Sequence, residues 1–131
     1  MVLDASVLVD FLIETDRGQE VERRLGESTG WLWAPAVIDA EVGHALRAEV
    51  RRRSISPRLA SEALADLMDM QLERVSHRFI AERAWQLRDN LSFYDGLYVA
   101  LAEALDAPLL TSDARLARAP GILADVEVLS V

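Results

Sequence analysis

Four acidic side chains stand in hydrophobic surroundings, where carboxylates are uncommon. Asp4, Glu41, Asp95 and Asp113 each lie within or directly after a run of apolar residues. Two carboxylates about 5 Å apart repel each other by roughly 3 kcal/mol at an effective dielectric constant of about 20. If the fold brings the four together, the cluster therefore needs protons or cations. Hard oxygen ligands of this kind are typical of a site for a divalent metal ion.

The elements that would position these acids alternate along the chain between short apolar runs and longer helical patterns. This alternation predicts a single α/β domain over residues 1–131, with a mostly parallel central sheet flanked by helices. The predicted strands are Val2–Asp4, Trp31–Ala34, a short one at Val75, Leu109–Thr111 and Val126–Leu129. The predicted helices are Ala5–Ile13, Arg17–Leu25, Val37–Arg53 after Pro35, one starting at Ser56-Pro57 and running through Met68, Phe79–Leu91, Tyr94–Leu105 and Ser112–Ala119.

The predicted topology brings the four acids to one edge of the sheet. Asp4 and Asp113 follow the carboxyl ends of strands, and Glu41 and Asp95 lie near the beginnings of helices entered from that edge. Ligands of open parallel sheets bind at the carboxyl ends of the strands. The helix that carries Asp95 is apolar on nearly every side, so we expect it to be buried.

A simpler role exists for two of the acids. Aspartate is a common N-cap residue, and both Asp4 and Asp113 precede predicted helices. Glu41 is harder to explain in this way, because Val37, Ile38 and Ala45 place it at the edge of an apolar stripe. The sequence alone leaves capping and metal binding open for Asp4 and Asp113.

Composition restricts the class of protein. The chain has 131 residues, of which 51% are hydrophobic, and it contains no cysteine. Disulfides, thiolate metal sites and catalytic thiols are thereby excluded. It has neither the N-terminal pattern of a secretion signal nor an apolar run long enough for a membrane span, so we expect a cytoplasmic protein without membrane contact. The net charge of −8 argues against a polyanionic partner unless bound metal and local arginines offset it.

At this level of detail the chain resembles a known family. Val-Leu-Asp-Ala-Ser-Val-Leu-Val, a helical glutamate, Tyr-Asp-Gly-Leu-Tyr-Val-Ala-Leu-Ala-Glu and Leu-Leu-Thr-Ser-Asp-Ala-Arg-Leu occur in the order and spacing of a PIN domain of the VapC toxin type. The similarity covers nearly the whole chain. It implies a metal-dependent endoribonuclease, the toxin of a toxin–antitoxin pair, that uses Mg²⁺ or Mn²⁺. It also implies an RNA substrate, a cognate antitoxin and a homodimer.

The resemblance assigns roles to particular residues. Asp4, Glu41, Asp95 and Asp113 match the acidic catalytic positions, and Ser6 and Thr111 match the small polar positions beside them. We expect Asp4, Asp95 and Asp113 to coordinate metal directly. Glu41 would position a water molecule or act from the second layer of ligands.

Two other classes of protein compete with this interpretation. An aspartyl-phosphate phosphatase or receiver domain also has an aspartate after its first strand, but normally keeps a lysine beside the phosphate. All 14 basic residues here are arginines. A non-catalytic binding module would leave four buried acids without a role. The run Arg51–Arg53 is interpreted mainly as a helix C-terminus and alternatively as an RNA contact.

Overall fold

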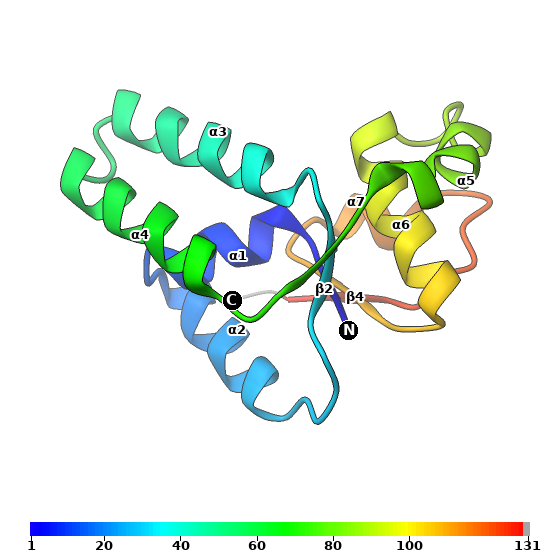
Figure 1. Ribbon diagram of the computed structural model, residues 1–131, viewed down its shortest axis with the longest axis horizontal. Helices are drawn as coiled ribbons and strands as arrows, with labels where there is room; N and C mark the ends of the chain where they lie inside the picture. Colours follow the sequence, from blue (N-terminus) through cyan, green and yellow to red (C-terminus); the bar gives the residue numbers. More distant parts are fainter. Residues whose placement is uncertain (130–131) are drawn as a thin grey trace.

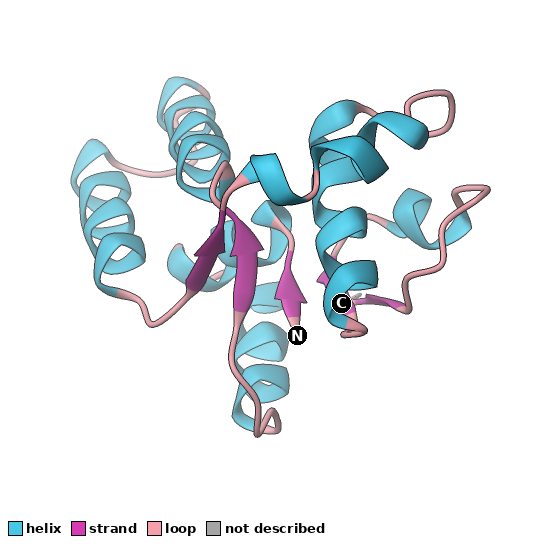
Figure 2. Ribbon diagram, turned by 45° about the vertical axis from the view of Figure 1, so that its right-hand side comes forward, coloured by secondary structure: helices cyan, strands magenta, loops and turns pink. Residues whose placement is uncertain are grey.

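The computed structural model describes residues 1–129, which form a sheet with helices on both of its faces (Figure 1). Its strands are β1 (Val2–Leu3), β2 (Trp33–Pro35), β3 (Glu73–Val75), β4 (Leu109–Thr111) and β5 (Val126–Val128). The strand order is β3-β2-β1-β4-β5, and every pairing is parallel. Figure 2 shows neighbouring strands with their arrowheads at the same edge. The predicted α/β class with a parallel sheet is confirmed.

The helices of the first half of the chain cover one face of the sheet, and those of the second half cover the other. The first group comprises α1 (Ala5–Leu12), α2 (Asp16–Gly26), α3 (Ile38–Arg51) and α4 (Pro57–Asp69). The second comprises α5 (Ala81–Gln86), α6 (Phe93–Leu105) and α7 (Ala114–Arg118). Figure 1 shows the first group on one side of the strands and the second on the other. Among residues 1–129, no helix is both long and apolar enough to cross a bilayer.

The strand order reverses direction at β1 and β4, and this reversal fixes where a ligand can bind. From β1 the chain proceeds outward to β2 and β3, then returns to β4 on the other side of β1. In open parallel sheets, the crevice at such a switch point lies beyond the carboxyl ends of the two strands. Asp4 directly follows β1, and Asp113 stands two residues after β4.

The core lies against β1, β4 and α6. Both residues of β1 and all three of β4 are fully buried. In α6, the seven consecutive residues from Gly96 to Ala102 are buried, as the continuous apolar pattern predicted. Ser92 caps this helix by accepting a hydrogen bond from the Asp95 backbone N–H (3.1 Å). The Ser92 cap and the burial of the following residues fix the first turn of α6, which carries Asp95.

The predicted helix Phe79–Leu91 is wrong in extent. A 3₁₀ turn occupies His77–Phe79, α5 covers only Ala81–Gln86, and turns follow. Ile80 is buried and has φ −125°, outside the helical region, so it separates the 3₁₀ turn from α5. Helical spacing of apolar residues therefore reflected a common buried face, not one continuous helix. Pro35 ends β2 and does not itself open a helix, since α3 begins at Ile38.

Candidate metal site at the strand switch point

Asp4 is held by two hydroxyl groups and does not act as a helix cap. It occupies the N-cap position of α1, but its side chain makes no capping hydrogen bond. Instead, Oδ2 accepts hydrogen bonds from Ser6 Oγ (2.9 Å) and from Thr111 Oγ1 (2.7 Å). Asp4 and Thr111 are the buried polar side chains of the described core. Capping is therefore excluded as the reason for this aspartate, and the two small polar residues predicted beside the acids do contact it.

Thr111 and Ser6 join β1 and β4 at the switch point. Thr111 Oγ1 also accepts a hydrogen bond from the Asp113 backbone N–H (3.0 Å), and Ser6 Oγ accepts one from the Ser112 N–H (3.2 Å). The two hydroxyl oxygens are 3.4 Å apart. This small network fixes the chain leaving β4 against the beginning of α1. It thereby sets the position of Asp113 relative to Asp4.

Asp113 does act as a cap. Its Oδ1 accepts a hydrogen bond from the Arg115 backbone N–H (2.9 Å), at the start of α7. The Arg115 guanidinium also pairs with the carboxylate, and this bonding holds the pKa of Asp113 below its usual value. Capping uses Oδ1 of Asp113 and does not exclude metal binding, but an ion would compete with the Arg115 guanidinium for the carboxylate.

The other acids are protonated more easily than free carboxylic acids. Burial raises the pKa of Asp4, Glu41 and Asp95, because it disfavours the charged form. The acids also influence each other: the charge of Asp95 raises the pKa of Asp4 and Glu41, and that of Asp113 raises the pKa of Asp95. The four predicted acids therefore lie within one electrostatic neighbourhood.

Glu41 and Tyr98 contribute polar atoms that lack partners. Glu41 Oε1 and Tyr98 Oη are buried and form no hydrogen bond with any described residue. The two groups lie near enough for Glu41 to raise the pKa of the tyrosine, after burial itself, yet their geometry falls short of a hydrogen bond. Unpaired buried oxygens of this kind indicate space for water or an ion. Tyr98 was missed from the sequence, although it stands one helical turn after Asp95.

The donor set fits a hard divalent cation, but the side chains are not closed around one. All candidate ligands are carboxylate or hydroxyl oxygens, and the repulsion between the acids would be relieved by positive charge. In their present conformation, no three acidic, histidine or cysteine side chains within residues 1–129 form a group that could hold an ion. Arg115 occupies both carboxylate oxygens of Asp113, whereas the Ser6 and Thr111 hydroxyls contact only Oδ2 of Asp4.

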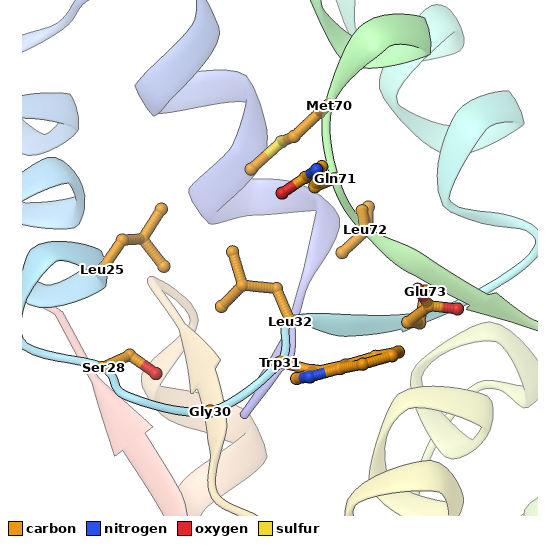
Figure 3. Close-up of a pocket in the computed structure, with 9 residues that line it drawn as sticks. All are labelled: Leu25, Ser28, Gly30, Trp31, Leu32, Met70, Gln71, Leu72 and Glu73. Carbon is orange, nitrogen blue, oxygen red and sulfur yellow. The ribbon is translucent and has the colours of Figure 1, made fainter.

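A hollow of about 440 Å³ opens beside Glu41. Val37, Ala40, Glu41, His44 and Tyr94 line it. Tyr94 is exposed and directly precedes Asp95, so an aromatic face stands at the edge of the acidic site. A larger hollow of about 780 Å³ lies elsewhere, between the end of α2, Trp31 and the segment Met70–Glu73 (Figure 3). None of the four predicted acids lines the larger hollow, so we do not assign the chemistry to it.

Known proteins match this chain over nearly its whole length. The family model described as PIN domain matches residues 1–122. Ribonuclease VapC1 of Mycobacterium tuberculosis (strain H37Rv) is 46% identical over 129 residues, which cover 97% of this chain and 96% of that protein. Ribonuclease VapC12 of the same strain is 38% identical over 130 residues, which cover 99% of each.

Two crystal structures have a similar fold. Mycobacterium tuberculosis VapC20, described as a sarcin-ricin loop cleaving toxin, superimposes with a TM-score of 0.68 at 15% identity, covering 93% of this chain and 95% of that chain. A chain of Rickettsia felis VapBC2, bound to a promoter DNA fragment, gives a TM-score of 0.66 at 15% identity over 98% of each chain. At such low identity, both likenesses support the fold alone.

Proposed function

This chain belongs to the PIN-domain family, among the VapC ribonucleases, and from that premise we propose that it is a metal-dependent endoribonuclease and the toxin of a type II toxin–antitoxin pair. Residues 1–131 would act as one nuclease domain. The observation that carries the proposal is the position of Asp4, Glu41, Asp95 and Asp113 at the β1–β4 switch point, where each influences the ionisation of another or is influenced by it. Asp4 is buried and the other three acids are partly buried, and carboxylates held together in this way repel one another unless a cation is their partner.

We assign metal binding to Asp4, Asp95 and Asp113, with Mg²⁺ or Mn²⁺ as the ion. When bound, such an ion lowers the pKa of water and offsets charge that develops on the phosphate during phosphodiester hydrolysis. Ser6 and Thr111 orient Asp4 by donating to Oδ2, which leaves Oδ1 for the ion. They act as positioning residues.

Glu41 is the candidate for orienting the attacking water. Its unpaired Oε1 is free to accept a hydrogen bond from a water molecule, and burial raises its pKa. Burial keeps the pKa of Tyr98 above its usual value, so its hydroxyl stays protonated and can donate toward the Glu41 carboxylate or an intervening water molecule. Tyr98 would thus help to position the Glu41 carboxylate.

RNA is the substrate that we propose for the hollow beside Glu41. Its openness to solvent and the exposed Tyr94 ring suit a single-stranded nucleotide, whose base stacks on aromatic side chains. The negative charge of the acids is unfavourable for a phosphate in the metal-free protein. Bound metal and nearby arginines would make the electrostatic potential at the site favourable for a phosphate, although the net charge of the chain remains negative.

We also propose a cognate antitoxin and a homodimer as partners. Several large apolar side chains are exposed, among them Leu64 and Met68 on α4 and Phe79 and Trp85 around α5. Apolar surface of this kind is typical of protein interfaces. The similarity to the VapC ribonucleases supports the proposal of an antitoxin partner, and the structural neighbour from Rickettsia felis is a VapBC2 structure.

The competing phosphatase or receiver class has no observation in its favour. A phospho-aspartate site normally keeps a lysine beside the phosphate, and this chain contains no lysine. A purely binding role would not explain why burial and neighbouring acids raise the pKa of Asp4, Glu41 and Asp95.

RNA cleavage with and without metal tests the proposal. We expect purified protein to cut mixed cellular RNA in Mg²⁺ or Mn²⁺ and to lose this activity in EDTA. Asp95→Asn should be folded and inactive, whereas Asp66→Asn, which changes an exposed aspartate on α4, should cleave normally. Cleavage that continues at the same rate in EDTA, or in folded Asp95→Asn protein, would refute the metal-dependent assignment.

A further inference from the structure

The Asp113 carboxylate is fully engaged by one residue, Arg115. Arg115 Nε lies 3.0 Å from Oδ1 and 3.1 Å from Oδ2, and Nη2 lies 2.6 Å from Oδ2. The Arg115 backbone N–H adds a fourth contact, to Oδ1 at 2.9 Å. Both oxygens of a proposed metal ligand are therefore occupied by a cation that belongs to the chain itself.

The charge of Arg115 extends to the rest of the acidic site. It lowers the pKa of Asp113 through direct hydrogen bonds and opposes the rise in the pKa of Asp95. Arg118, on the same short helix, influences Asp113 only through its charge and forms no hydrogen bond with it among the described residues. Arg115 thus supplies part of the positive charge that the four acids require.

We propose that Arg115 is a resident counter-ion of the metal site, which leaves Asp113 when a divalent ion binds and then presents its guanidinium to a phosphate of the RNA. This inference rests on the proposed function, because it requires both a metal and an RNA substrate. It assigns to Arg115 a role that none of the sequence motifs assigned.

The geometry favours such an exchange. The Arg115 side chain is 78% exposed and that of Asp113 is 28% exposed, so water screens their attraction and separating them costs little. A divalent ion offers the same oxygens twice the charge. The freed guanidinium is a planar fork whose hydrogen-bond geometry matches a phosphate. The exposed position of Arg115 places that fork at the solvent side of the site.

Mn²⁺ binding measured by calorimetry tests the first half of the proposal. Arg115→Gln should bind Mn²⁺ about two- to fivefold more tightly than wild type, the range expected for loss of one exposed ion pair. Arg118→Gln removes the same charge from the same helix without touching Asp113, and should change the affinity by less than about 1.5-fold. Arg115→Lys keeps the charge but not the fork, and should fall between wild type and Arg115→Gln.

Cleavage at saturating Mn²⁺ tests the second half. The freed guanidinium contacts substrate, so Arg115→Gln should lower kcat/KM for a single-stranded RNA by about tenfold or more, as expected for a lost charge-assisted phosphate contact. Arg118→Gln should stay within about twofold of wild type. Tighter metal binding combined with weaker catalysis is a pair of effects that a residue needed only for folding would not produce.

The possible failures are distinguishable. If Arg115→Gln and Arg115→Lys bind Mn²⁺ as wild type does, or more weakly, the exchange is refuted while the proposed function stands. If Mn²⁺ binding tightens but cleavage is unchanged, the phosphate contact is refuted. If neither wild type nor any variant binds Mn²⁺, the proposed metal-dependent function fails, and the exchange fails with it.

Discussion

Replacing Thr111 by valine isolates the hydrogen bond that holds Asp4. The change keeps the shape of a fully buried side chain but removes the hydroxyl that donates to Asp4 Oδ2 at 2.7 Å. A hydrogen bond to a charged group contributes about 1.5–3 kcal/mol. We therefore expect the free energy of unfolding to fall by about 2 kcal/mol at pH 7.5 without metal. For a chain of this length, that corresponds to a Tm lower by about 7 °C.

Thermal unfolding in EDTA, followed by circular dichroism, measures the effect. Thr111→Ser is the matched control, because it keeps the hydroxyl and removes one methyl group, which costs about 1 kcal/mol. The valine variant should approach wild type as the pH falls, since Thr111 lowers the pKa of Asp4 and its bond matters most to the ionised form. Valine and serine variants of equal stability at pH 7.5 would refute this account of how Asp4 is held.

Three further predictions concern charge, packing and RNA. The pKa values of Asp4, Glu41 and Asp95 are raised in the folded protein, so the metal-free protein should lose stability as the pH rises from about 4 through those values. Asp95→Asn should therefore have the same Tm as wild type near pH 4 and a higher Tm at pH 7.5. A lower Tm of the variant at both pH values would contradict this sign. Gly18→Ala should lower the Tm by more than about 7 °C in the same measurement, because its Cβ would lie 2.2 Å from a backbone oxygen of α1, and a neutral result would disprove the close contact. If Arg51–Arg53 contact RNA, replacing all three by glutamine should make RNA binding less dependent on salt concentration. Filter binding with the Asp95→Asn variant as background measures this dependence. An unchanged salt dependence would mean that these arginines only form the end of α3.

Local sequence patterns predicted the elements but not their contacts. The apolar run after Tyr94 correctly indicated a buried helix, because such a helix has no face suited to water. In the predicted helix Phe79–Leu91, the buried positions include Ile80, Ala84 and Leu87. Trp85, an apolar residue of the same pattern, is 60% exposed, and the pattern could not show that the helix stops at Gln86. Where a helix ends depends on packing against distant residues, which periodicity does not record.

At the candidate site, too, the sequence indicated individual residues but not the contacts between them. The sequence identified Asp4 but left helix capping open, since the decisive partner, Thr111, lies 107 positions away in the chain. Arg115 and Tyr98 were overlooked as functional residues. A signal was present for each: an arginine two residues after Asp113, and a polar tyrosine one turn after Asp95 within an otherwise apolar helix. Neither signal indicates a functional residue until the fold shows that the acids lie close together.

The most direct test of the central claim is anomalous diffraction from crystals soaked in millimolar Mn²⁺. We predict an anomalous peak bounded by the carboxylates of Asp4, Asp95 and Asp113 at the β1–β4 switch point, with oxygen–metal distances of about 2.0–2.3 Å. Glu41 should lie one water molecule away, and the Arg115 guanidinium should have left Asp113. Crystals that show no peak at these three aspartates, while the protein still cleaves RNA in the same buffer, would contradict the account.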